Sequence, residues 1–263
     1  MKTIKKSIKK LPGVMTAKRL IKSIPMSLAV TRDKALFLRD FERFKALSRG
    51  SDNRFCMSWS NCRPCLGEAT ADAGFDRHYL YHTSWAARIV ADIKPEVHID
   101  ISSQLQFSTL VSAFVPVKFY DYRPADIKLD NLTTGAADVT ALQFENKSIN
   151  SLSCMHVVEH IGLGRYGDPL DPDGDLKACV ELQRVLNDGG SLLFVVPVGK
   201  PQVVFNAHRI YSYEQVISMF AELELVEFVM IPDDVNTYPL LNPRPEIVME
   251  QEFGCGCFWF QRK

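Results

Sequence analysis

Long apolar runs are missing from this sequence. No stretch approaches the ~18 consecutive apolar residues that a membrane-spanning helix needs. The apolar run at residues 24–30 is short and is interrupted by Pro25 and Ser27, so it does not have the core of a secretory signal. Internal repeats are absent as well. These absences argue against a membrane-spanning or repeat architecture and predict a cytoplasmic protein.

Acidic residues are missing from the first 32 positions, since the first acid is Asp33. The whole chain balances 31 basic against 31 acidic residues, and this zero net charge predicts no nucleic-acid partner. The basic segment at residues 1–30 has two interpretations. It is either a solvated, disordered tail or a segment that makes peripheral contact with an anionic membrane surface.

The seven cysteines do not form a disulfide framework, because their number is odd and no export signal accompanies them. We therefore expect reduced thiols. Cys56, Cys62 and Cys65 form a C-x5-C-x2-C pattern, and Cys255 and Cys257 share one face of the last expected strand. Four thiolates can bind zinc, whereas strand cysteines are usually small core residues, so both interpretations stay open.

Strand-like and helix-like segments alternate from residue 97 onward. Helical spacing is also found at residues 31–47 and 76–92. The expected strands lie at residues 97–101, 117–121, 132–138, 149–155, 191–198, 225–231 and 255–261. Such alternation is typical of a doubly wound α/β domain, with parallel strands and helices on both faces. We expect this domain at residues 96–263, preceded by a helical and loop extension at residues 31–95.

Residues 138–198 contain a series of short motifs in a fixed order. The series is Asp138, Leu142-Gln143-Phe144, Glu159-His160, RVLNDGG at residues 184–190, and Pro197. It resembles the middle of the class I S-adenosylmethionine (SAM)-dependent methyltransferases. More narrowly, HIDISSQLQF, FYDYRP, HVVEHIGLGRYGDPLDPDGD and GCGCFWF resemble a small uncharacterised family first catalogued from Caenorhabditis and also found in bacteria. The resemblance covers about residues 75–263. It implies a Rossmann-like, mostly parallel seven-stranded sheet with an antiparallel last strand, and SAM as the cofactor.

Three aspartates lie where the superfamily places acids at the ends of successive strands. Asp100 matches the acid that ends the first strand. Asp121 follows 21 residues later, at the place of the acid that takes the ribose hydroxyls. Asp138 matches the position beside the adenine amino group. The resemblance therefore implies that all three bind the cofactor, whereas each taken singly also fits an acid that caps a loop.

The turn after the first expected strand lacks the superfamily's glycines. Ser102, Gln104 and Gln106 stand at their places. Glycine lets the backbone approach a cofactor and adopt a positive φ. Ser102 and Ser103 become candidate cofactor ligands through their hydroxyl groups. The alternative is a methyltransferase-like binding or scaffold domain that has lost SAM binding.

The end of the fourth expected strand carries the candidate catalytic residues. The resemblance places this end beside the transferred methyl group. His156 is the candidate general base, because an imidazole titrates near neutrality. Glu159 or His160 is expected to orient His156 or to replace it. The alternative is that this Glu-His pair is a structural feature of the fold.

Two segments rich in histidine and aromatic residues are candidates for substrate binding. The resemblance places residues 75–85 in a lid over the pocket, although a packed helix fits them equally. Residues 208–212 resemble the His-x-x-(Tyr or Phe)-(Ser or Thr) stretch of many small-molecule and glycan methyltransferases, although an ordinary helix entry fits them too. The candidate substrate-binding residues are His78, Tyr79, His82, His208, Arg209 and Tyr211.

The loop at residues 164–175 concentrates carboxylates, at Asp168, Asp171, Asp173 and Asp175. Hard cations bind such oxygens, but acids before a helix also cap it. We expect no metal here, and keep a metal-dependent enzyme on the same scaffold as an alternative. The leading prediction is a SAM-dependent methyltransferase acting on a sugar, glycan or other small polar metabolite.

Overall fold

The computed structural model describes residues 31–48 and 55–263, and the chain divides into two units between Gly74 and Phe75. The basic segment at residues 1–30, with its expected disorder or membrane contact, lies outside the described residues. The first unit contains the expected helix at residues 31–47 and a 3-10 helix, η1 (Trp59–Asn61). None of the described helices is long and apolar enough to cross a membrane.

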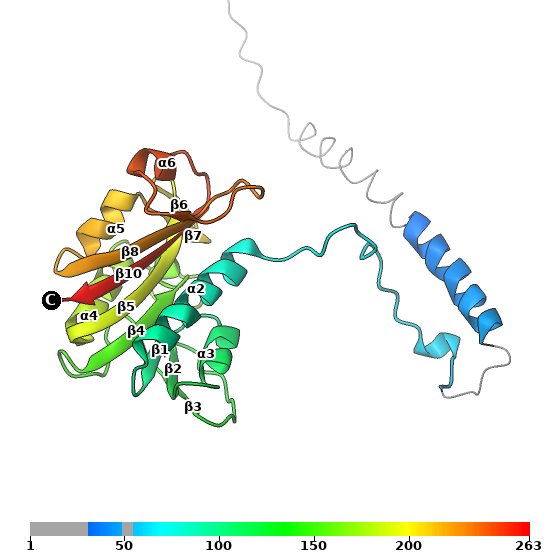
Figure 1. The fold of residues 1–263 in the computed structure, drawn as a ribbon, viewed down its shortest axis with the longest axis horizontal. Coiled ribbons are helices and arrows are strands. Elements are labelled where there is room, and N and C mark those ends of the chain that lie inside the picture. Colours follow the sequence, from blue (N-terminus) through cyan, green and yellow to red (C-terminus); the bar gives the residue numbers. More distant parts are fainter. Residues whose placement is uncertain (1–30, 49–54) are drawn as a thin grey trace, which may run out of the picture. The chain divides into compact units, whose positions relative to one another are not determined.

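The second unit is built around an eight-stranded sheet of order β3-β2-β1-β4-β5-β10-β8-β9 (Figure 1). The strands are β1 (His98–Ile101), β2 (Val117–Asp121), β3 (Leu132–Ala136), β4 (Ile149–Met155), β5 (Leu186–Val198), β8 (Leu223–Ile231), β9 (Leu240–Leu241) and β10 (Gly254–Arg262). Strands β1 to β5 pair in parallel, and β10 lies antiparallel between β5 and β8. The predicted Rossmann-like, mostly parallel sheet with an antiparallel last strand is therefore confirmed, and β9 adds an eighth strand.

Helices cover both faces of this sheet. They are α2 (Arg77–Ile93), α3 (Leu105–Val111), the 3-10 helix η2 (Val158–His160), α4 (Gly174–Val185), α5 (Tyr213–Met219) and α6 (Pro245–Met249). Side chains of successive residues in a strand point to opposite faces. In β5, Phe194 packs in the core with α4, α5 and α6, whereas Leu193 and Val195 pack in the core with α2 and α3. The sheet therefore has a buried layer on each side.

Helix α2 belongs to the same compact unit as the sheet. The Asp76 side chain caps it by accepting a hydrogen bond from the backbone N–H of Tyr79, at 3.2 Å. Ala86 and Val90 on its inner face are fully buried in the core shared with β2 and β5. The unit thus starts at Phe75, before α2, whereas the expected division at residues 95 and 96 lies after it.

The junction between α4 and β5 differs from the sequence-based expectation. The strand was expected at residues 191–198, but α4 stops at Val185 and β5 starts directly at Leu186. The pairing with β4 shifts register there, because Ile149 pairs with Leu186 and Ser151 with Ser191. The glycines accommodate this irregularity, since Gly189 has a φ of +75°.

Part of the segment between β5 and α5 forms a small hairpin of β6 (Gln202–Val204) and β7 (His208–Ile210). Sequence periodicity does not predict it, since each strand has only three residues. Helix α5 follows with a serine cap, in which Ser212 and Gln215 form a reciprocal capping box. The hairpin matters for the site, because it carries His208 and Arg209.

Candidate active site

Three adjoining cavities lie at the carboxyl ends of the parallel strands. Cavity 1 has a volume of about 410 Å³, cavity 2 about 140 Å³ and cavity 3 about 180 Å³. Ser102 and Tyr166 line all three. The cavities surround the point where β1 lies between β2 and β4 and the strand order reverses. Open α/β sheets bind their ligands at this position.

The turn after β1 is closed without a glycine. Ser102 has a φ of +57°, the left-handed conformation that glycine normally supplies. Its backbone N–H donates to the carbonyl oxygen of Tyr120 at 2.6 Å, and its hydroxyl donates to the same oxygen at 3.2 Å. The Ser103 hydroxyl accepts a hydrogen bond from the N–H of Met155 at 3.0 Å. Two serines thus anchor this turn to β2 and β4.

Two of the three predicted cofactor acids line these cavities. Asp121 lines cavity 3, and its Oδ1 accepts a hydrogen bond from the N–H of Arg123 at 2.7 Å. Asp138 lines cavity 2, and its Oδ1 accepts from the backbone and the hydroxyl of Thr140 at 2.8 and 2.7 Å. In each case the capping bonds fall on one oxygen. The rest of the cavity 2 wall is largely apolar and includes Val139 and Ile161.

Asp100 lines none of these three cavities. It is fully buried beneath the turn, where its carboxylate accepts hydrogen bonds from Ser108 and, at 2.8 Å, from Ser153. Burial raises the pKa of Asp100 to about 6, and hydrogen bonds from serines, including Ser103, act against this rise. Asp100 is therefore placed to hold the turn rather than to touch a cofactor.

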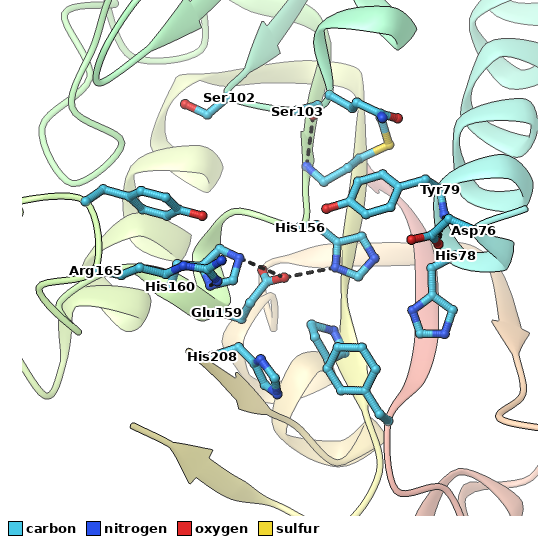
Figure 2. Close-up of a pocket in the computed structure, with 15 residues that line it drawn as sticks. Asp76, His78, Tyr79, Ser102, Ser103, His156, Glu159, His160, Arg165 and His208 are labelled. Carbon is cyan, nitrogen blue, oxygen red and sulfur yellow. Dashed lines mark hydrogen bonds and ion pairs between the residues drawn. The ribbon is translucent and has the colours of Figure 1, made fainter. Parts of the chain in front are cut away.

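The three predicted catalytic residues come together at the end of β4 (Figure 2). His156 Nδ1 lies 2.9 Å from Glu159 Oε1, and His160 Nε2 lies 3.7 Å from the same oxygen. Glu159 is 1% exposed, and its Oε2 is a buried oxygen with no hydrogen-bond partner among the described residues. A buried carboxylate between two imidazoles stabilises positive charge on either ring.

The hydrogen bonds of the two imidazoles define which nitrogen carries the proton in the neutral ring. His160 Nδ1 lies 2.6 Å from the carbonyl oxygen of Ala207, which only accepts, so Nδ1 is the donor and Nε2 keeps its lone pair. His156 Nδ1 donates to Glu159 in the same way. The free Nε2 of His156 lies 3.5 Å from the Cys255 thiol.

The predicted substrate-binding residues fall into three groups. His78, Tyr79 and His208 line cavity 1. His82 is fully buried behind it, and its ring packs edge-on against that of His156 at 5.0 Å. Burial, followed by the charge of His156, lowers the pKa of His78 to about 4 and that of His82 to about 3. Both rings are therefore neutral at pH 7.

Arg209 and Tyr211 form the third group, and both are buried away from cavity 1. The Arg209 guanidinium donates to the carbonyl oxygens of Ile161 at 2.6 Å and Pro172 at 3.1 Å. The Tyr211 hydroxyl donates to Asp175 at 3.0 Å. These contacts tie β7 to the loop before α4, which is a structural role.

Most of the aspartates in the loop at residues 164–175 accept hydrogen bonds from, or pair with, other groups of the protein. Asp168 accepts from the N–H groups of Gly162, Gly164 and Tyr166. Asp171 pairs with Lys177, and Asp175 with Tyr211 and Arg209. Asp173 is the N-cap residue of α4. Asp168, Asp171 and Asp175 are therefore engaged in turn hydrogen bonds and ion pairs, whereas the Asp173 side chain makes no capping hydrogen bond.

Sequence reasoning missed several residues that line cavity 1. Phe253 precedes β10, and its ring packs against those of His78 at 5.4 Å and His208 at 4.7 Å. Arg165 and Tyr166 lie in the loop at residues 164–175, in which the sequence indicated only the aspartates as candidate ligands. Phe253 gave no sequence signal, because only the folded sheet brings it beside α2 and β7.

The fold around these cavities is that of the class I SAM-dependent methyltransferases. The N-methyltransferase NodS from Bradyrhizobium japonicum WM9, solved with S-adenosyl-l-homocysteine, matches with a TM-score of 0.50 and 14% identity over 71% of this chain and 88% of that chain. A candidate sarcosine dimethylglycine methyltransferase from Galdieria sulphuraria matches with a TM-score of 0.51 and 14% identity, over 70% and 86%. The [4+2]-cyclase SpnF also matches, with a TM-score of 0.50 and 12% identity, over 74% and 84%. These likenesses establish the fold, and a cyclase among them shows that the fold alone does not determine the reaction.

The sequence comparison is narrower. Residues 130–234 match the family described as Caenorhabditis protein of unknown function, DUF268. The predicted resemblance to that family is thereby confirmed over these residues. No curated protein matches the chain.

Proposed function

We propose that this chain is a SAM-dependent methyltransferase that acts on a small polar acceptor, with a sugar or glycan as the favoured class. One observation carries the proposal: the predicted cofactor residues Asp121, Asp138 and Ser102 line cavities that adjoin the His160–Glu159 pair. Cofactor residues and a proton acceptor thus meet at the sheet edge where this fold binds ligands.

The cavity walls fit the parts of the cofactor. Val139 and Ile161 provide apolar contact for an adenine ring in cavity 2, and Asp138 provides an acceptor for its amino group. Asp121 in cavity 3 has an oxygen that no described residue engages, and this oxygen suits a ribose hydroxyl. Ser102 lies at the junction with cavity 1. SAM bound there supplies a methyl group made electrophilic by its sulfonium.

The residues of the chain handle the proton of the acceptor. The Nε2 lone pair of His160 takes the proton when the acceptor oxygen or nitrogen is methylated, because Nδ1 is already a donor to Ala207. The imidazolium that results lies 3.7 Å from the Glu159 carboxylate. That carboxylate is buried, and its Oε2 accepts no hydrogen bond from a described residue, so it stabilises the charge of the protonated ring.

Cavity 1 is the acceptor site. Its volume of about 410 Å³ is within the range of small-molecule sites. Tyr79 and Phe253 offer aromatic faces on which a sugar ring can pack, and Arg165 and the half-buried His208 offer hydrogen-bond donors. His78 is neutral at pH 7 and adds a polar edge without a charge.

Calorimetric titration with SAM and with S-adenosylhomocysteine tests the proposal. We expect both to bind, and Asp121→Ala to weaken binding by about 10-fold or more, since a hydrogen bond to a charged group contributes about 1.5–3 kcal/mol. The exposed Asp126→Ala, from the same loop region, is the matched control and retains affinity. Transfer of labelled methyl from SAM to a panel of sugars then tests the acceptor class. Absence of binding by either nucleoside at millimolar concentration overturns the proposal in favour of a binding or scaffold domain.

A further inference from the structure

A cluster of soft and borderline metal ligands borders cavity 1. His78, His156 and Cys255 each offer one ligand atom, and these atoms all lie within 4.8 Å of one another. They come from α2, the end of β4 and β10, which the sheet brings together. In the proposed methyl transfer, neither Cys255 nor His78 accepts or donates a proton.

The spacing of the ligand atoms fits a tetrahedral ion. Bonds of about 2.1 Å to nitrogen and 2.3 Å to sulfur place neighbouring ligand atoms roughly 3.5 Å apart. The Nε2 of His156 lies 3.5 Å from the Sγ of Cys255. All three ligand atoms lie within 4.8 Å of one another, so a shift of roughly 1 Å or less by the half-buried His78, which lines the cavity, completes the tetrahedral spacing.

The protonation of the two imidazoles suits coordination. A metal binds the neutral ring through a nitrogen lone pair. His156 donates from Nδ1 to Glu159 at 2.9 Å, which leaves Nε2 as the ligand atom. This carboxylate–histidine arrangement orients the ligating histidine in many metal sites. His78 is also neutral at pH 7, because burial lowers its pKa to about 4.

We propose that His78, His156 and Cys255 bind one zinc ion at the wall of cavity 1. Two imidazoles and one thiolate select zinc over magnesium or calcium, which prefer oxygen ligands. Three protein ligands leave the fourth tetrahedral position open, as in catalytic zinc sites. That position faces the cavity, since His78 and His156 both line it, and it suits the hydroxyl or thiol of a small molecule.

The charges and protons of the binding step balance. Cys255 loses its thiol proton to solvent and binds as a thiolate, so the ion with three ligands carries one net positive charge. His156 keeps its Nδ1 proton for Glu159. His160 lies outside the ligand set and remains the proton acceptor of the proposed methyl transfer. Metal binding requires neither SAM nor an acceptor, so it is tested independently of that function.

The test uses the full chain, stripped of metal with a chelator and titrated with Zn²⁺ or Co²⁺. Zinc content, competition with a chromophoric chelator, and the visible and near-ultraviolet spectrum of the Co²⁺ form are measured. The variants are Cys255→Ser and His78→Gln. The matched control is Cys62→Ser with Cys65→Ser, which removes the cysteine pattern of the first unit. Thermal melts followed by circular dichroism show which variants fold.

We expect about one ion per chain in the wild type and in the control, and an affinity about 100-fold lower or more in Cys255→Ser and His78→Gln. The thiolate-to-cobalt band is expected to disappear in Cys255→Ser. If Cys255→Ser does not fold, the half-buried His78→Gln carries the test. The proposal is overturned if the wild type binds no ion, if the control loses the ion, or if the folded Cys255 or His78 variant binds as tightly as the wild type.

Discussion

The Ser153 hydroxyl donates a hydrogen bond to Oδ1 of Asp100 at 2.8 Å, and the two residues are register partners on β4 and β1. His98 Nε2 lies 2.9 Å from the same hydroxyl, so the bond belongs to a buried polar network inside the sheet. The network lies directly beneath the turn that borders all three cavities. An acid expected to bind a cofactor is thus used to build the turn instead.

The pH dependence of stability should report on Asp100. Burial raises its pKa to about 6 in the folded protein, whereas the unfolded chain titrates near ~4. The folded state therefore binds more protons between these values. The stabilisation is fully present below pH ~4 and is lost as the pH rises through about 6, by roughly 2–3 kcal/mol.

Asp100→Asn removes this titration and retains a carbonyl that accepts from Ser153. Urea unfolding of both proteins at pH 4, 5, 6 and 7 measures the effect. We expect the free energy of unfolding of the wild type, relative to the variant, to fall between pH 4 and 6 and to be level above that. A difference that is equal at every pH would show that Asp100 has an ordinary pKa.

The turn itself can be tested at Ser102, whose φ is +57°. Ser102→Gly and Ser102→Ala both remove the hydroxyl and differ only in the β carbon. At most positions a protein with alanine is more stable than one with glycine. In the left-handed region, however, the β carbon of alanine lowers the free energy of unfolding by about 1–2 kcal/mol. We expect the glycine variant to be more stable by about 1 kcal/mol in urea unfolding. An alanine variant of equal or greater stability would contradict the backbone assignment.

The same turn shows what could be read from the sequence. The strands at 117–121 and 149–155 were predicted to the residue, because short apolar runs bounded by polar residues are strong local signals. The absence of the superfamily's glycines after the first strand indicated that this turn is built differently here. The sequence did not show that Ser102 adopts the conformation of the absent glycine, because hydrogen bonds to β2 decide this.

The catalytic cluster of the candidate site was predictable because its three residues are close in sequence. His156, Glu159 and His160 share one strand end, so motif spacing brought them together correctly. Cys255 is 99 residues from His156 and meets it only through the pairing of β10 with β5. Arg209 was predicted to bind substrate, but its donors point to backbone carbonyls that no local pattern reveals.

Substitutions of Arg209 and Arg165 distinguish an arginine that stabilises the fold from an arginine that binds the acceptor. The Arg209 side chain is 8% exposed, lies 3.6 Å from Asp175 and donates to backbone carbonyls. Arg209→Met leaves these groups unpaired and should lower the free energy of unfolding by about 3–5 kcal/mol. The exposed Arg165→Met should lower it by less than about 1 kcal/mol and instead raise the KM for the acceptor. Equal melting temperatures for the two variants would contradict the structural role of Arg209.

His160 should be the residue on which methyl transfer depends most. Removing a general base typically lowers kcat by about 10²–10⁴. We expect His160→Ala to show this loss while its SAM affinity, measured by calorimetry, falls far less, because the proposed cofactor acids Asp121 and Asp138 are unaltered even though His160 lines cavities 1 and 3.

Added imidazole distinguishes lost proton transfer from lost structure. The alanine variant leaves a space beside Glu159, where a free imidazole can bind with its ring next to the buried carboxylate. Partial recovery of kcat that saturates with imidazole concentration is expected if His160 accepts the proton. Recovery should be absent in His156→Ala, because the Nε2 of His156 faces the Cys255 thiol and is not the proposed proton acceptor. If imidazole restores His156→Ala and not His160→Ala, the two histidines exchange roles and the proton acceptor is His156.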